Sequence, residues 1–307
     1  MESVILPPKL PETPAKPRPS ATLIAINEHN EVLLVQRNKK SRDFSGATVF
    51  PGGNFDRKQD GSLEETALRE TFEETGLLLA IPAPGKTSTW PSKEECLEAR
   101  EAIYAHKMIF KQFLGKHGLI PATRCLYRFS SWITPPNYPK RFQAFFFVVF
   151  LADVLAKGDR QQYLLTPDTS EEVVSIRFIH PTTALREFAE KKISIPTPQA
   201  YNISTLDEII HHSSDPTSSL REGVRQLSEG IYGGMTLHPL LLVGDGYNGR
   251  VIFTYEGDET RGGPVGQAHR SVDWMDAGSF ITSDVLHRNF DVFKFKEDWF
   301  EKYHPKL

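Results

Sequence analysis

The sequence predicts an α+β protein, an α/β/α sandwich with a mixed β-sheet, a helical insertion and a β-rich C-terminal extension. Short apolar segments at 21–27, 31–37 and 145–151 have the length and composition of strands. A capped amphipathic helix follows the glycine pair at 52–53. Residues 94–114 carry apolar side chains at roughly helical intervals between two strand-rich regions, which indicates an inserted helical segment.

The chain has the composition of an ordinary globular protein. Of its 307 residues, 39% are hydrophobic and 24% are charged, and 20 phenylalanines are enough for a substantial core. The net charge of −3 without a basic run gives no electrostatic footprint for nucleic acid. Two cysteines favour a reducing compartment, and no apolar run reaches the length of a membrane span or reads as a secretory signal. We therefore expect a soluble intracellular protein with no nucleic-acid or membrane partner.

Composition divides the chain into three parts. Residues 1–20 are Pro-rich and predict a disordered arm. Residues 21–212 form the predicted main domain, with the helical insertion at about 82–126. Residues 213–307 are predicted to be an extension that packs on this core.

The elements follow in order. Strands are expected at 21–27 and 31–37 around a turn at 28–30, and a third enters the glycine turn. The uninterrupted apolar run at 145–151 is typical of a central strand that is buried on both faces. Further strands are expected at 48–50, 127–134, 141–152 and 173–179, and a hairpin at 240–243 and 251–255. Helices are expected at 94–114, after His180, at 204–211 and at 221–229.

One helix concentrates acidic residues. Ser62 and Glu65 form a capping-box pattern, and Gly76 supplies a left-handed end. At 100° per residue, the three carboxylates listed below project within an arc of roughly 100°. These carboxylates either form a solvated acidic face or bind a divalent cation that offsets the repulsion between their charges. The preceding Gly-Gly turn favours the metal site. The three residues are Glu70, Glu73 and Glu74.

These residues resemble the signature box of the Nudix hydrolases. The resemblance rests on Gly53, Arg69-Glu70, Glu73-Glu74 and Gly76-Leu77. It implies hydrolysis of a nucleoside diphosphate linked to another moiety, with Mg²⁺ or Mn²⁺ held by Glu70, Glu73 and Glu74. The chain departs from the family in one place: two extra residues lie between Gly53 and Arg69, and no Glu stands at the first acidic position of the box. The acids that could replace it are Asp56, Asp60, Glu171 and Glu172.

A second pattern lies upstream of the helix. Residues 33–37, Arg42, Gly46 and the sequence Phe-Pro-Gly-Gly at 50–53 resemble the coenzyme A diphosphatase branch, and the Nudix chains closest in pattern are its peroxisomal, RP2-type members. Val35 and Asn38 depart from that motif. Alone, Arg37 and Arg42 would read as solvated cations, whereas the resemblance implies that they bind substrate phosphates. Gly52 and Gly53 would let the backbone approach the phosphates.

The resemblance also implies roles and a substrate. Arg69 would orient Glu73 by an ion pair, and Glu73 and Glu74 would be catalytic. Glu171 or Glu172 would orient the attacking water, or is simply solvated. The expected partner is a small nucleotide or coenzyme substrate, namely coenzyme A or acyl-CoA, with 3′,5′-ADP and (acyl)phosphopantetheine as products. Two alternatives stay open: another Nudix substrate such as an ADP-linked sugar, a dinucleotide or a prenyl diphosphate, and a catalytically silent binding module.

Three further features carry smaller expectations. The helical insertion either packs on the core or covers the acyl or pantetheine end of the substrate. His238, His269 and His287 do not have zinc-site spacing and are expected to be hydrogen-bonded structural residues. The final Pro305-Lys306-Leu307 keeps two residues of a peroxisomal address, which is either accidental or makes the protein peroxisomal rather than cytoplasmic.

Overall fold

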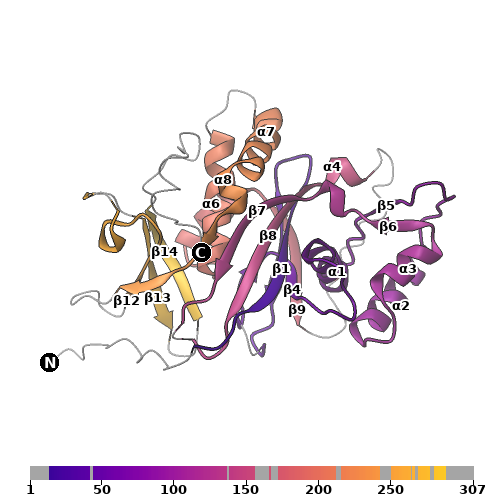
Figure 1. The fold of residues 1–307 in the computed structure, drawn as a ribbon, viewed down its shortest axis with the longest axis horizontal. Coiled ribbons are helices and arrows are strands. Elements are labelled where there is room, and N and C mark those ends of the chain that lie inside the picture. The colour runs from indigo at the N-terminus through magenta and orange to yellow at the C-terminus, as the bar shows by residue number, and fades with distance from the viewer. Residues whose placement is uncertain are drawn as a thin grey trace. The chain divides into compact units, whose positions relative to one another are not determined.

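The main sheet of the computed structural model has eight strands and mixed direction (Figure 1). Its order is β10-β7-β8-β1-β2-β3, with β4 paired to β1 and β9 paired to β2. The β10–β7 pair is parallel, whereas the β1–β2, β1–β4, β2–β3 and β2–β9 pairs are antiparallel. The predicted mixed α+β fold is confirmed. The structure describes residues 14–41, 44–136, 138–155, 166, 172–211, 216–242, 250–263, 265–266, 269–276 and 280–287.

The chain divides into two compact units. One contains Pro19–Phe129 and Phe145–Pro181, and the other contains Ser130–Ala144 and the residues from Thr182 onward, together with the segment before Pro19. The predicted boundary near residue 212 stays a prediction.

The first unit holds most of the sheet and the acid-rich helix. Its helices are α1 (Leu63–Thr75), α2 (Lys93–Tyr104), α3 (Phe110–Lys116) and α4 (Leu151–Val154). Its strands are β1 (Arg18–Ile26), β2 (Val32–Arg37), β3 (Thr48–Val49), β4 (Gly52–Asn54), β5 (Ala80–Pro82), β6 (Leu119–Pro121) and β9 (Val173–Ile179), with a 3-10 turn at Thr123–Cys125. Strands β7 (Tyr127–Ile133) and β8 (Phe142–Phe150) begin in one unit and end in the other.

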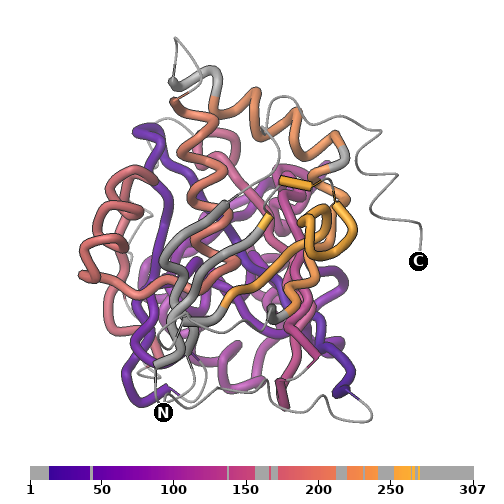
Figure 2. The backbone as a smooth tube through the Cα atoms, turned by 90° about the vertical axis from the view of Figure 1, so that its left-hand side faces the viewer, coloured from indigo at the N-terminus to yellow at the C-terminus, as the bar shows by residue number. Residues whose placement is uncertain are grey.

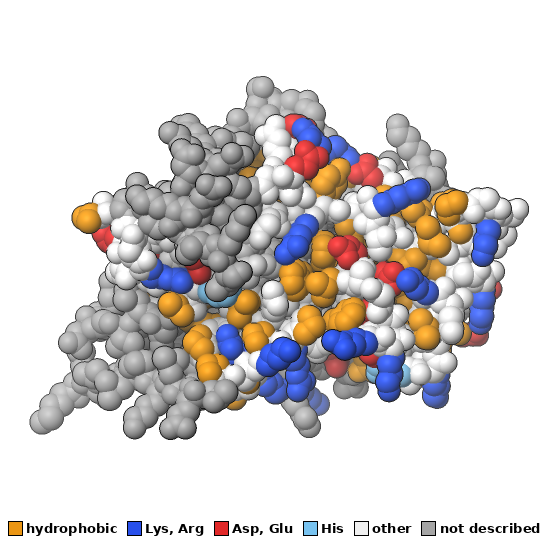
Figure 3. Space-filling model, viewed as in Figure 1, with side chains coloured by type: hydrophobic (Ala, Val, Ile, Leu, Met, Phe, Trp, Pro, Cys, Tyr) orange, Lys and Arg blue, Asp and Glu red, His pale blue; other side chains and the backbone are white. Residues whose placement is uncertain are grey.

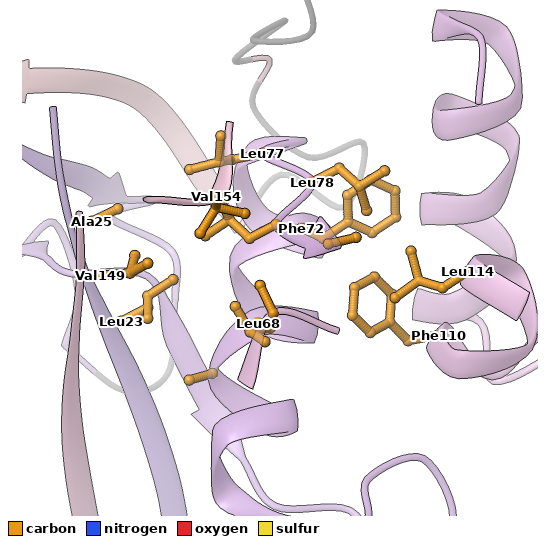
Figure 4. Close-up of a cluster of buried hydrophobic side chains, with 14 of the residues drawn as sticks. Leu23, Ala25, Leu68, Phe72, Leu77, Leu78, Phe110, Leu114, Val149 and Val154 are labelled. Atoms are coloured by element: carbon orange, nitrogen blue, oxygen red, sulfur yellow. The ribbon is translucent and has the colours of Figure 1, made fainter. Parts of the chain in front are cut away.

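Helix α1 packs its apolar face on the sheet. Leu68 and Phe72 are fully buried with Leu23, Ala25 and Val149 of the strands (Figure 4). Phe72 also stacks on the α3 ring of Phe113 at 5.7 Å between ring centroids. At roughly 25 cal/mol per Å² of apolar surface, this burial is what fixes the helix to the sheet.

The second unit adds helices and a separate antiparallel sheet. Its helices are α5 (Pro181–Ala189), α6 (Thr197–His211), α7 (Pro216–Glu229) and α8 (Ile231–Gly234), and α6 and α7 lie side by side (Figure 2). Its strands are β10 (Thr236–Leu237), β11 (Leu240–Leu242), β12 (Arg250–Thr254), β13 (Arg270–Asp276) and β14 (Phe280–His287), with a 3-10 turn at Glu259–Arg261. Strands β11 to β14 pair in sequence order, so the β-rich C-terminal extension is confirmed.

One of the three histidines is buried here and fully bonded. His269 lies with its Nδ1 2.7 Å from the Glu256 carbonyl oxygen and its Nε2 3.1 Å from the Tyr201 hydroxyl. Its hydrogen-bonded structural role is therefore confirmed.

Some predicted boundaries were wrong. The expected helix over 94–114 is two helices, because the chain turns between Tyr104 and Phe110, where His106 has φ +54°. The glycine pair forms strand β4 against β1 rather than a free turn. Strand β1 begins at Arg18, inside the expected arm, and α6 begins at Thr197, because Pro198 is compatible with the first helical turn. Strand β8 ends at Phe150, where α4 begins.

The surface has a mixed character. On the face in Figure 3, orange hydrophobic side chains alternate with blue basic and red acidic ones over the described part. No helix among the described residues has both the length and the apolar character that a membrane crossing requires.

Candidate active site

The ends of α1 are fixed by local chemistry. The Ser62 hydroxyl accepts a hydrogen bond from the Glu65 amide at 3.3 Å. Gly76 ends the helix with φ 78°, and its amide donates a hydrogen bond to the Phe72 carbonyl oxygen. The predicted caps are confirmed, with one difference. The Glu65 carboxylate accepts from the Gly61 amide at 2.8 Å, one residue before the position that a capping box expects.

Arg69 is the hub of the acidic cluster. Its Nε and Nη2 atoms donate to the two oxygens of Asp60 at 2.8 and 2.9 Å. Its Nη1 lies 2.8 Å from Glu73 and 2.9 Å from Glu70. Burial alone lowers the pKa of Arg69, but the Asp60 hydrogen bonds and the charges of Glu70 and Glu73 raise it above its ordinary range. The predicted Arg69–Glu73 ion pair is present, and a permanent cation lies among the box acids.

Asp60 is the acid that pairs with the box arginine. It is buried, and besides Arg69 it accepts hydrogen bonds from the Thr66 hydroxyl at 3.0 Å and from the Asp56 amide at 3.1 Å. Asp56 contributes its backbone here rather than its carboxylate. Of the four acids that could replace the missing box glutamate, Asp60 therefore has the charge contact with Arg69.

Burial makes it costly for the three helix glutamates to ionise. Burial, opposed by Arg69 and reinforced by Glu73, raises the pKa of Glu70 to about 7. Burial raises the pKa of Glu73, with Arg69 acting against it. Burial and the charge of Glu70 raise the pKa of Glu74 well above its usual range, against the lowering effect of Arg37. The repulsion expected between these carboxylates is therefore present in the fold.

Gly52 and Gly53 are glycines because other groups occupy the space of a side chain. A Cβ on Gly52 would lie 2.4 Å from the backbone oxygen of Ala21 in β1. A Cβ on Gly53 would lie 2.4 Å from the carboxyl carbon of Glu70. The Gly52 amide donates to the Glu74 carboxylate at 3.1 Å, so that amide orients a box acid. The role of the glycine backbone toward phosphates stays a prediction.

Arg37 reaches the same cluster from the end of β2. Its Nη1 lies 3.6 Å from Glu74 and its Nη2 lies 3.8 Å from Glu172. The Tyr104 hydroxyl, from the end of α2, donates to Glu172 at 3.4 Å. The structure thus brings Glu172 to the site, whereas Arg42 and Glu171 lie outside the described residues.

The donor chemistry of the cluster fits a divalent cation. Five carboxylates and two guanidinium groups lie together, so negative charge is in excess, and carboxylate oxygens are the ligands that Mg²⁺ and Mn²⁺ prefer. Within the described part of the chain, however, no three ligating side chains converge on one point. Glu70 and Glu73 face Arg69, and Glu74 faces Arg37 and Gly52. The carboxylates involved are Asp60, Glu70, Glu73, Glu74 and Glu172.

Sequence reasoning missed Arg100 of α2. This buried arginine donates to the Glu73 carbonyl oxygen through Nε at 3.2 Å and Nη2 at 2.8 Å. Its neighbours Ala99 and Ile103 are on the buried face of α2, so an arginine within an apolar stripe was the available signal.

Comparisons with known proteins identify a Nudix domain in the chain. The profile of the NUDT19 Nudix domain matches residues 59–206. An acyl-coenzyme A diphosphatase NUDT19 of Xenopus laevis is 28% identical over 57% of this chain and 59% of its own length. A putative nudix hydrolase 7 of Caenorhabditis elegans is 27% identical over 62% of this chain and 60% of its own length. The alignments thus span about three fifths of these relatives.

The fold has a solved counterpart. A NUDIX hydrolase from Alicyclobacillus acidocaldarius covers 70% of this chain and 99% of its own chain, with a TM-score of 0.52 and 24% identity. At that identity the likeness concerns the fold alone. The box residues, the matched domain and the fold lead to one conclusion: residues 59–206 of this chain are a NUDT19-type Nudix domain of the Nudix hydrolase superfamily.

Proposed function

We propose that the protein is a metal-dependent diphosphatase that hydrolyses coenzyme A or acyl-CoA to 3′,5′-ADP and (acyl)phosphopantetheine. The observation that carries the proposal is the cluster in which Glu70, Glu73 and Glu74 of α1 lie with Arg69 of the same helix and with Arg37 of β2. The diphosphatases named among the relatives and the coenzyme A motif around Arg37 support the substrate class.

The reaction adds one water across the P–O–P bond. The water oxygen forms a new P–O bond, the bridging oxygen leaves with the other phosphate, and the water proton passes to a base. Attack at either phosphorus gives the same two phosphomonoesters. A Mg²⁺ or Mn²⁺ ion held by Glu70, Glu73 and Glu74 would supply Lewis-acid catalysis and charge stabilisation.

Other residues of the cluster would position the acids, accept the water proton and bind the phosphate charge. Arg69 holds Glu73 and, through Asp60, fixes the preceding loop to the helix. Glu74 and Glu172 are the carboxylates available to accept the water proton. Arg37 pairs with both, and its planar fork also suits a phosphate oxygen of the substrate. The assigned roles of Arg42 and Glu171 stay predictions.

A panel assay tests this function. Purified protein with Mn²⁺ is incubated with coenzyme A, acetyl-CoA, a long-chain acyl-CoA, an ADP-linked sugar, a dinucleotide and a prenyl diphosphate, and products are identified by mass spectrometry. We expect cleavage of the coenzyme A substrates and a loss of at least about a hundredfold in Glu74→Gln. The matched control is Glu98→Gln, an exposed acid of α2 that should keep full activity. Cleavage of another substrate with coenzyme A intact would contradict the substrate assignment.

One observation favours a second candidate, a silent Nudix-fold binding module. In the described residues the box carboxylates contact arginines rather than a common point. If wild type shows no hydrolysis above the Glu74→Gln background at saturating Mn²⁺, the result supports such a module and not a hydrolase.

A further inference from the structure

Arg100 joins the helical insertion to the end of α1. Its guanidinium makes two hydrogen bonds to the Glu73 carbonyl oxygen and two to Thr166, through Nη1 to the hydroxyl at 2.8 Å and through Nη2 to the carbonyl at 3.0 Å. The side chain is 7% exposed. A buried cation of this kind is stable only where it is hydrogen-bonded, so its position is strongly determined.

Arg100 donates to the C-terminal end of α1, where the carbonyl groups need hydrogen-bond donors from outside the helix. The last four carbonyl groups of a helix have no bond within it. Gly76 satisfies the Phe72 carbonyl, and the Thr166 amide satisfies that of Thr75 at 3.1 Å. No basic residue lies in the last turn of α1, so Arg100 supplies both the donor for the Glu73 carbonyl and the cation that the helix dipole favours at this end.

Other contacts fasten the insertion along the rest of α1. The ring of Phe110 lies 5.6 Å from that of Phe72, and Lys111 pairs with Glu65 at 2.7 Å near the start of the helix. The Gln59 amide nitrogen, in the loop before α1, donates to the Ile103 carbonyl of α2 at 3.2 Å. Figure 4 shows α3 side chains facing Phe72. Helices α2 and α3 therefore contact α1 at its beginning, middle and end.

We propose that the insertion braces the Nudix-box helix and that Arg100 is the positioning residue that fixes the backbone carrying Glu73 and Glu74. The inference rests on the proposed function, because it assigns these glutamates to catalysis. Arg100 contacts the acid-bearing segment through the peptide carbonyl of Glu73, so its loss should change the geometry of the acids and leave their chemistry intact.

Kinetics of three variants test the proposal. Arg100→Met should lower kcat at least tenfold, leave KM for coenzyme A within about twofold, and raise the Mn²⁺ concentration needed for half activation. Arg100→Lys keeps a cation and an ammonium donor group but lacks the planar guanidinium fork, so it should recover a measurable part of this loss. Arg124→Met removes an exposed arginine of the same insertion and should match wild type. Equal kcat and half-activation in Arg100→Met and Arg124→Met would overturn the proposal.

Amide hydrogen exchange of the metal-free protein separates this inference from the proposed function. In Arg100→Met, amides 73–77 should exchange at least tenfold faster, while amides 65–67 keep their wild-type rates. Should Arg100→Met fail to fold, the same comparison is made with Arg100→Lys, in which faster exchange is again confined to 73–77. Unchanged exchange at 73–77 overturns the brace whatever the activity. Faster exchange there in a protein that cleaves no substrate refutes the proposed function and keeps the brace.

Discussion

Arg69 and Asp60 face one another as a planar fork, with Nε–Oδ1 and Nη2–Oδ2 distances of 2.8 and 2.9 Å. Both side chains are buried, at 4% and 6% residue exposure. A buried pair of this geometry has little net stabilising value against an apolar pair, but the loss of Asp60 leaves the buried Arg69 without its bidentate partner, although Glu70 and Glu73 still contact it.

Asp60→Asn should therefore destabilise the protein by about 3 kcal/mol, because Arg69 keeps its charge and loses its bidentate partner. The measurement is urea unfolding with an unchanged m-value. Glu98→Gln, which removes an exposed carboxylate, should change the free energy of unfolding by less than about 0.5 kcal/mol. Equal unfolding midpoints for Asp60→Asn and wild type would show that the fork is dispensable.

Mn²⁺ alone should stabilise the folded protein. At a hundred times its dissociation constant, the ion adds about 2.7 kcal/mol, which raises Tm by several degrees. Glu73→Gln should show a smaller rise, because one of three proposed ligands becomes neutral. A wild-type Tm that does not respond to Mn²⁺ would argue strongly against the metal site.

The protonation of Glu70 gives the metal-free protein a particular dependence on pH. Its pKa rises from 4.5 in the unfolded chain to about 7 in the fold, so between these values the native state keeps a proton that the unfolded state has lost. Its stabilising contribution is therefore full below pH 4.5 and is lost as the pH rises through 7, with a slope of at most about 1.4 kcal/mol per pH unit.

The check compares wild type with Glu70→Gln by urea unfolding in a chelator at pH 5, 6 and 7. The difference in free energy of unfolding should shift in favour of the variant as the pH rises. A difference that is constant over this range would mean that Glu70 is ionised throughout.

The two box glycines should fail in different ways. Gly52→Ala meets the backbone oxygen of Ala21 at 2.4 Å and should destabilise the fold, because a strand cannot easily move. In Gly53→Ala the new methyl group meets the end of the Glu70 side chain, which can rotate away. The variant should therefore lose the stabilisation by Mn²⁺, while its metal-free stability changes less than that of Gly52→Ala.

Gly115→Ala is the matched control for these glycines. It lies in α3, where a Cβ would have nothing within 4 Å, and alanine is the better helix former. We expect unchanged or slightly raised stability and a normal Mn²⁺ response. Identical behaviour of Gly53→Ala and Gly115→Ala would remove the steric argument for Gly53.

Local signals predicted the acid-rich helix well. Ser62 and Gly76 lie close in sequence to the backbone groups that they cap, so the ends of α1 could be predicted from the sequence. The Arg69–Glu73 pair, four residues apart, is local in the same sense.

Contacts between distant residues could not be read in this way. Arg100 and Glu73 are 27 residues apart, and their contact depends on how α2 packs. The break after Tyr104 depends on local backbone geometry around His106 that helical periodicity does not encode. Four acids were candidates to replace the missing box glutamate, and only the folded loop shows that Asp60 pairs with Arg69.

The Asp60–Arg69 fork links loop length to side-chain length. Aspartate is one methylene shorter than glutamate, and the two additional residues before α1 let the chain approach the helix closely enough to make up that reach. Relatives with the shorter loop should therefore carry the longer acid, and those with this loop should carry aspartate. Exchanging either feature alone would remove the bidentate partner of a buried guanidinium, so the two should be inherited together.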